Sequence, residues 1–221
     1  MFRKADLSLG KLRRDGAALL KDRNGAATIE FSIVGPAFIA LLFAVLYTAL
    51  IFLAQQMLET AAQSAGRLLL TGAAQTARMA NGDVGMSASD FKNAICNGAS
   101  GTNASGQTFS IPRLLPPMLS CSRLTVNVST ATTYNVNSTA NPTFRYDSNG
   151  NIIATGTGYN SQSGGSGQNQ IIVLQLIYLW PTGVGPLGLN LVNQPKSNRM
   201  LVATAVFTTE AYSCNSSQTS C

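Results

Sequence analysis

Residues 31–54 read FSIVGPAFIALLFAVLYTALIFLA, and this stretch contains no charged residue. The next charged residue is Glu59. As an α-helix, residues 31–54 would be about 36 Å long, which is enough to cross a hydrocarbon layer of about 30 Å with some tilt. We therefore expect a transmembrane helix over residues 26–54, and no second span later in the chain.

Two other structures could produce an apolar stretch near the N-terminus. A helix buried in a soluble core is rarely this long and apolar on every side. A cleavable secretory signal has a shorter apolar region, about 7–15 residues, and ends in a small-x-small site. Here Phe52 occupies the position where such a site needs a small residue. The pattern therefore favours a helix that is retained in the membrane.

The positive charge of the chain is concentrated before this helix. Residues 1–24 contain seven basic and three acidic residues, so they carry +4 of the total charge of +6. Basic residues beside an apolar span are typical of its cytoplasmic side. We expect the N-terminus in the cytoplasm, one pass through the membrane, and the residues after about 55 on its other side. In a bacterium, this membrane would be the inner membrane and the far side the periplasm. A nucleic-acid partner is not expected, because such proteins place their cations on a folded face.

The composition leaves few means of catalysis. The chain has no histidine, which excludes Ser-His-Asp sites, histidine-bound zinc and imidazole bases. Only 11% of residues are charged, against roughly 25% in an average domain, and nine are acidic. We therefore expect no enzyme, no catalytic residue, no cofactor, no metal site and no small-molecule substrate.

The junction between the basic leader and the apolar stretch has a distinctive order of residues. It reads Asn24-Gly25-Ala26-Ala27-Thr28-Ile29-Glu30-Phe31. This order resembles the processing site of type IV prepilins, where a membrane aspartyl peptidase cuts after the glycine. The resemblance implies cleavage between Gly25 and Ala26, which would remove residues 1–25. Glu30 would then be the fifth residue of the mature chain, followed by Phe31.

Physical arguments agree with this resemblance. Glycine breaks a helix and gives the backbone the freedom that a protease cleft needs. An acid inside a bilayer costs about 2.5–3.5 kcal/mol, so Glu30 needs a partner there. The new ammonium group of Ala26 in a neighbouring subunit could provide it. The alternative is that Glu30 lies in the first helical turn, where the helix dipole favours an acid by a few tenths of a kcal/mol.

The segment GAATIEFSIVGPAFIALLFAVLYTAL resembles the start of the TadE-like family, pseudopilins of the tight-adherence (Flp) pilus system. The resemblance rests on Gly25, Glu30, Phe31 and Pro36, and it covers about residues 24–75 with a weaker similarity near 199–212. It implies a prepilin peptidase and other pilins as partners, with Glu30 and Phe31 in subunit docking. The chain is too long for a major Flp pilin, which favours a minor pseudopilin. Pro36 should kink the transmembrane helix.

The rest of the chain predicts a small α+β domain. Residues 55–80 have apolar and small residues at helical spacing, so we expect an amphipathic, alanine-rich helix that continues the anchor to about residue 78. Residues 81–221 should form an extracytoplasmic α+β domain with an antiparallel sheet, and Asn149-Gly150 should form a hairpin turn. A polar loop near residues 155–169 is a connector or, alternatively, a binding loop. The expected strands are 124–134, 143–154, 170–180 and 200–212.

All four cysteines follow the predicted membrane span, on the oxidising side. Three disulfide pairings are possible, and proximity in sequence favours Cys96–Cys121 and Cys214–Cys221. Free cysteines are the alternative, while the absence of a Cys-x-x-Cys pair argues against zinc.

Two functions remain for the whole chain. The first is a non-catalytic TadE-like minor pseudopilin that takes part in assembly of a tight-adherence pilus or a related secretion filament, and that could itself enter the pilus. The second is a single-pass envelope protein whose periplasmic domain binds a surface or a partner, in which case Gly25 and Glu30 would be incidental.

Overall fold

The computed structural model describes residues 25–78, 84–103, 105–131, 144–153, 171–183, 185 and 188–209. The chain divides into two units, residues 1–46 and 47–221, which we describe separately. A long apolar helix precedes antiparallel sheets in chain order, which confirms the predicted α+β class. Residues 1–24 of the predicted leader (residues 1–25) and the polar loop near residues 155–169 lie outside the described residues.

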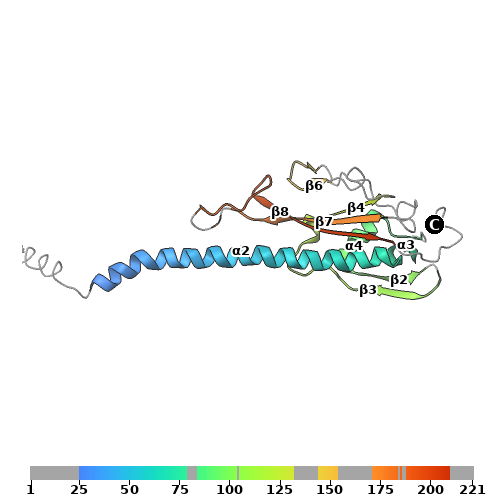
Figure 1. Cartoon of the computed structure of the whole chain (residues 1–221), viewed down its shortest axis with the longest axis horizontal. Coiled ribbons are helices and arrows are strands. Elements are labelled where there is room, and N and C mark those ends of the chain that lie inside the picture. Colours follow the sequence, from blue (N-terminus) through green and yellow to red (C-terminus); the bar gives the residue numbers. More distant parts are fainter. Residues whose placement is uncertain are drawn as a thin grey trace, which may run out of the picture. The chain divides into compact units, whose positions relative to one another are not determined.

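Helix α2 extends from Ala26 to Leu70 and is the longest element (Figure 1). The part of the helix that belongs to the first unit, residues 26–46, carries almost only apolar side chains. In the second unit the helix has one buried face, and the buried residues recur every three or four positions, as an amphipathic helix requires. These residues are Ile51, Ala54, Leu58, Ala61, Ala62, Ala65 and Leu69.

The helix ends earlier than the sequence predicts. It stops at Leu70, not near residue 78, because Gly72 adopts a left-handed conformation with φ of 73°. Glycine takes this conformation without a steric penalty, and it is a common way to end a helix. A single short turn follows in α3 (Ala73–Thr76), and the chain then enters strand β1 (Ala77–Arg78).

The main sheet consists of β4 (Leu124–Ala131), β7 (Ile171–Pro181) and β8 (Asn198–Thr208). The strands are antiparallel in the order β4-β7-β8, so β7 is central. Each overlaps one predicted strand. Figure 1 shows β7 and β8 beside the C-terminal part of α2. Residues of α2, β4, β7 and β8 share one hydrophobic core.

Strand β7 is buried on both faces, which explains its nearly continuous apolar sequence. On one face, Ile172, Leu174 and Leu176 belong to the core that also contains α2. On the other face, Ile177 and Leu179 pack with residues of the hairpin formed by β5 (Arg145–Tyr146) and β6 (Ile152–Ile153). The sheet therefore lies between the helix and this hairpin.

The hairpin turns at the predicted position, although its strands are only two residues long. Gly150 has a φ of 76°, which a turn of this kind requires. The Asp147 carboxylate accepts hydrogen bonds from the backbone N–H and the side-chain amide of Asn151, at 2.8 and 3.1 Å. These bonds favour the charged form and lower the pKa of Asp147. These side-chain hydrogen bonds thus support a hairpin whose strands pair over only two residues.

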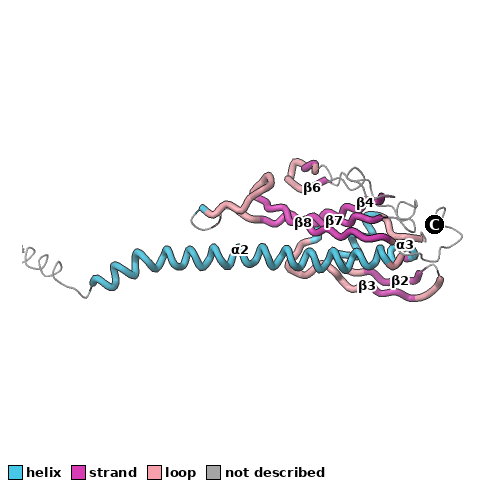
Figure 2. Tube along the Cα trace, in the orientation of Figure 1, coloured by secondary structure: helices cyan, strands magenta, loops and turns pink. Residues whose placement is uncertain are grey.

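A second part of the domain was not predicted from the sequence. Helix α4 (Ala88–Asn97) and the strands β2 (Ala99–Asn103) and β3 (Thr108–Ile111) follow one another, and β1-β2-β3 form a small antiparallel sheet. Figure 2 shows β2 and β3 on the opposite side of the C-terminal part of α2 from β7 and β8. The helix is therefore packed between two groups of elements.

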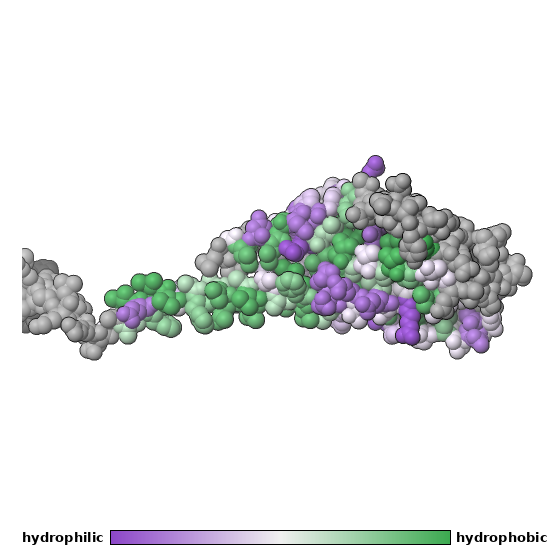
Figure 3. All heavy atoms as spheres, in the orientation of Figure 1, coloured by the Kyte–Doolittle hydropathy of each residue, from purple (hydrophilic) through white to green (hydrophobic). Residues whose placement is uncertain are grey.

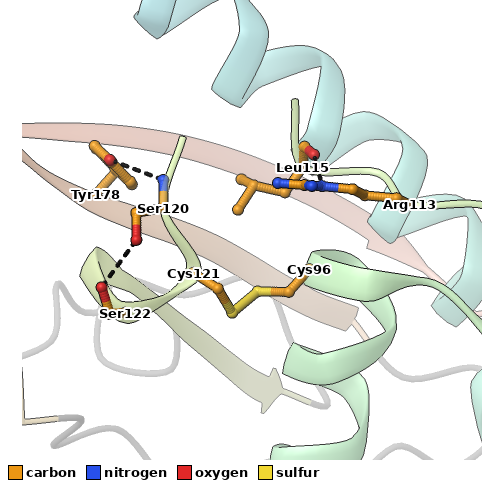
Figure 4. The surroundings of a disulfide bond; sticks show 7 residues. All are labelled: Cys96, Arg113, Leu115, Ser120, Cys121, Ser122 and Tyr178. Atoms are coloured by element: carbon orange, nitrogen blue, oxygen red, sulfur yellow. Dashed lines mark hydrogen bonds between the residues drawn. A yellow bond between two sulfur atoms is a disulfide. The ribbon is translucent and has the colours of Figure 1, made fainter. Parts of the chain in front are cut away.

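The disulfide Cys96–Cys121 links α4 to the short 3₁₀ turn η2 (Cys121–Arg123) that precedes β4 (Figure 4). It is one of the two pairings that sequence proximity favours. Tyr178 of the central strand adds a second link here, because its hydroxyl accepts a hydrogen bond of 3.1 Å from the backbone N–H of Ser120. Cys214 and Cys221 lie outside the described residues.

The contact between α2 and β8 depends on a small residue at position 66. A Cβ atom on Gly66 would lie 3.0 Å from Cε1 of Phe207 and 3.6 Å from the Cβ of Ala205. A Gly66→Leu variant should therefore overpack this contact and lower the free energy of unfolding by about 1–3 kcal/mol. Thermal unfolding in detergent would measure the loss. Gln63→Leu, on the exposed face one turn earlier, is the control, and equal stability of the two variants would contradict the packing described here.

Candidate functional site

The junction singled out in the sequence forms the beginning of helix α2. Gly25 directly precedes the helix, Ala26 is its first residue, and Glu30 is its fifth. Glu30 is exposed, and its neighbours Ile29 and Phe31 are 62% and 75% exposed. The carboxylate therefore lies on an exposed and mostly apolar helix surface, and it is the one charge among residues 26–46 of the helix.

The position of Glu30 bears on the alternative explanation from the helix dipole. No acidic residue lies in the first turn of α2. The favourable effect of the dipole is largely confined to that turn, so it gives little reason for an acid at the fifth position. Glu30 needs another explanation.

The fold itself does not require glycine at position 25. A Cβ atom there would meet no other atom within 4 Å, and Gly25 is not among the glycines with positive φ. Gly72, in contrast, adopts the left-handed conformation that ends α2. Packing among the described residues therefore gives no reason for glycine at position 25.

Pro36 lies inside α2, where it removes one backbone hydrogen bond to the carbonyl group of residue 32. Two other small residues lie beside it along the helix. Ser32 donates its hydroxyl hydrogen to the carbonyl oxygen of Ile29, at 2.8 Å. The Phe31 ring packs over Gly35, where a Cβ atom would lie 3.5 Å from the ring. The predicted kink at Pro36 stays a prediction.

The first part of α2 is exposed on all sides and apolar. Exposed large hydrophobic residues occur at many consecutive positions and are not confined to one stripe, as they are on an amphipathic helix. Figure 3 shows the corresponding run of hydrophobic surface. Within the described residues, α2 is the one helix that is long and apolar enough to cross a membrane, and the most apolar part of it is largely exposed. The exposed residues of the first unit are Ile29, Phe31, Ile33, Val34, Phe38, Ile39, Leu41, Leu42, Phe43, Val45 and Leu46.

Two residues at the other end of this apolar run have roles that the sequence analysis missed. The Tyr47 hydroxyl donates a hydrogen bond to the carbonyl oxygen of Thr182, and the Gln55 side-chain amide donates one of 2.9 Å to that of Val202. Both bonds tie α2 to the sheet region of its own unit. The signal was present, because Tyr47 is the one tyrosine in residues 31–54 and Gln55 is the first amide after them.

Other kinds of site find little support among the described residues. No group of three or more histidine, cysteine, aspartate or glutamate side chains lies close enough together there to hold a metal ion. Lys92 of α4 has a pKa lowered by burial, and the pKa of Tyr146 is raised by burial. Neither pKa shift has the other group among its causes.

Comparison with known proteins gives one match. Residues 25–67 match the family model described as TadE-like protein. No curated protein and no solved structure matches the chain. The matched segment begins at the glycine of the junction and includes Glu30, Phe31 and Pro36. The chain thus carries a TadE-like segment from Gly25 to Arg67, which confirms the resemblance seen in the sequence.

Proposed function

We propose that this protein is a minor pseudopilin that takes part in assembly of a tight-adherence pilus or a related secretion filament, without catalytic activity. The observation that carries the proposal is an exposed carboxylate, Glu30, on an exposed apolar helix, within the segment that matches the TadE-like family. Such a helix is stable in a membrane or against other apolar helices, whereas a lone charge there needs a partner of opposite sign.

The proposed sequence of events starts in the bacterial inner membrane. Residues 1–24 remain on the cytoplasmic side, and α2 spans the bilayer once, which places the second unit in the periplasm. A prepilin peptidase cuts the bond between Gly25 and Ala26 and removes the basic leader. The absence of a structural requirement for glycine at position 25 supports this assignment.

Cleavage would create the partner for Glu30. The α-ammonium group of Ala26 lies about 6 Å, roughly one helical turn, before Glu30 along the helix, so it meets the carboxylate of a neighbouring subunit that is shifted by about one turn. An ammonium group of one subunit and the Glu30 carboxylate of the next would neutralise each other, and Phe31 beside it would add apolar contact. This pairing would recruit the mature chain and would not recruit the uncut one, whose N-terminus carries the leader.

Substitution of Gly25 tests the first step. A Gly25→Val variant, produced together with an active prepilin peptidase, should keep its leader, because a β-branched residue lacks the backbone freedom of glycine. Gly35→Ala is the matched control, since its new Cβ atom makes only an ordinary contact with the Phe31 ring. Both proteins are extracted from the membrane and measured by intact mass spectrometry. The Gly25→Val protein should be heavier than the Gly35→Ala protein by the mass of residues 1–25.

Three outcomes of this experiment separate the candidate functions. A cut control and an uncut Gly25→Val variant support the pseudopilin. A wild-type chain that resists alkaline extraction and is never cut indicates a single-pass envelope protein with a partner-binding domain. A wild-type chain that is released by alkaline extraction contradicts both.

A further inference from the structure

The exposed face of α2 changes its chemistry within one turn. Phe52 and Leu53 are the last exposed large hydrophobic residues, at 66% and 45% exposed. The exposed residues that follow on the helix are polar, namely Gln56, Thr60, Gln63 and Arg67. This change marks the end of the surface that suits hydrocarbon.

The second unit begins to pack on α2 before this change. Tyr47 already bonds to the carbonyl group of Thr182, and Ile51 is buried in the core. A hydrocarbon layer of about 30 Å that starts at Phe31 takes about 20 helical residues and ends near Leu50. No spacer therefore separates the membrane from the domain, and residues 48–55 would lie at the depth of the lipid headgroups.

A cavity of about 380 Å³ lies at this level of the second unit. One wall is the helix, with Thr48, Ile51, Phe52 and Gln55, and the other is formed by Leu191 and by the start of β8, Arg199 to Leu201. Apolar side chains make up most of the lining, and Phe52 is also exposed on the lipid side of the helix. The cavity therefore adjoins the surface that we assign to the bilayer.

Arg199 is the one ionisable residue in this lining, which contains no aspartate or glutamate. Its Nη1 donates a hydrogen bond of 3.1 Å to the carbonyl oxygen of Leu191, which holds the side chain at the loop between β7 and β8. A guanidinium group has five N–H donors and matches phosphate oxygens in pairs. Glu59, one turn beyond the cavity, accepts a hydrogen bond of 2.9 Å from Gln55.

We propose that this cavity holds one anionic phospholipid of the surrounding bilayer, with its phosphate on Arg199 and its glycerol and upper acyl region against Ile51, Phe52 and Met200. The inference rests on the membrane insertion of the proposed function. An anionic lipid fits because the lining combines one positive charge with an apolar wall beside the exposed helix surface. Lipid binding would hold the domain at a constant distance from the bilayer, the same in each neighbouring subunit.

Native mass spectrometry of the full chain in mild detergent tests this proposal. The protein is mixed with equal amounts of phosphatidylglycerol and phosphatidylcholine, and the lipids that stay bound are counted. The wild type should retain one phosphatidylglycerol molecule per chain, with a preference of about tenfold over phosphatidylcholine. Both lipids carry a phosphate, but the choline group of phosphatidylcholine neutralises its charge, whereas phosphatidylglycerol keeps a net negative charge to pair with Arg199. Arg199→Gln should abolish the preference. Arg67→Gln, on the exposed face of α2 and outside the cavity lining, should leave it unchanged.

Two further variants keep the test valid if Arg199→Gln does not fold. Arg199→Lys retains the charge and should retain most of the preference. Thr48→Trp reduces the space from the helix side and should lower retention of the lipid while the charge remains.

Equal retention of the two lipids, or an unchanged preference in Arg199→Gln, would overturn the proposal. So would displacement of the bound lipid by inorganic phosphate, which would indicate a site for free anions, or a second copy of the chain in place of the lipid. The same preparation is checked for alkaline-resistant membrane insertion and for a mature N-terminus. A failure of lipid binding with both properties intact therefore refutes this inference alone.

Discussion

Replacement of Glu30 by glutamine is expected to weaken the association of the mature chain with a neighbouring pilin subunit by about two to four powers of ten. The proposed partner is the ammonium group of residue 26, held at a depth where water is scarce. Removing one member of such a pair leaves the other charge without compensation, which costs about 3–5 kcal/mol. Each factor of ten in a binding constant corresponds to about 1.4 kcal/mol.

Co-purification of tagged subunits from membranes, followed over a dilution series, would measure this loss. Glu59→Gln is a matched control, because Glu59 is the other acidic residue of α2 and forms its hydrogen bond with Gln55 in the second unit. The leader should be removed from both variants. If the Glu30→Gln chain associates as strongly as the control, the docking role of the carboxylate is wrong.

Loss of the disulfide between Cys96 and Cys121 is expected to have the largest effect on the stability of the domain. The bond closes a loop with a sequence separation of 25, for which the chain-entropy model gives about 3.5 kcal/mol. Cys96 is 1% exposed, so alanine at both positions avoids placing a polar group in the core. For a domain of this size, the melting temperature should fall by about 7–14 °C.

Thermal unfolding of the Cys96→Ala/Cys121→Ala protein, followed by circular dichroism in detergent, measures this change. A reducing agent should lower the melting temperature of the wild type towards that of the double variant. If the double variant has the same melting temperature as the wild type, then other contacts hold α4 and the start of β4 together, and the disulfide does not stabilise the domain.

The sequence predicted best those elements whose residues repeat a simple pattern. The strand at residues 171–181 is buried on both faces, and its continuous apolar run is visible without any structure. Leu124, Val126 and Val128 alternate with polar residues in the predicted strand 124–134, and all three belong to or contact the main core. Asn149-Gly150 marked the turn of the hairpin.

Elements that depend on contacts distant in sequence were harder to predict. Helix α4 is only ten residues long, although Ser87 and Asp90 form a capping box that could have announced it. The strand at residues 99–103 contains glycine and asparagine, which are depleted in strands, and it pairs with the short strand at residues 108–111. The end of α2 was predicted too late, because alanine-rich helical spacing continues past Gly72.

The residues of the candidate site could be predicted from the sequence, but their exposure and arrangement could not. Gly25, Glu30, Phe31 and Pro36 are adjacent in sequence, so one helix brings them together without any tertiary contact. The exposure of Glu30 beyond the first turn, in contrast, could be learned only from the structure. The cavity beside Arg199 depends on a helix and a strand about 150 residues apart, and no local pattern indicates it.

The central claim is that a peptidase creates a new N-terminus at the beginning of a membrane helix. Identification of the first residue of the wild-type protein recovered from membranes of cells with an active prepilin peptidase tests this claim most directly. The account predicts a chain that starts at Ala26 and resists alkaline extraction. A chain that still starts at Met1 under these conditions would contradict it.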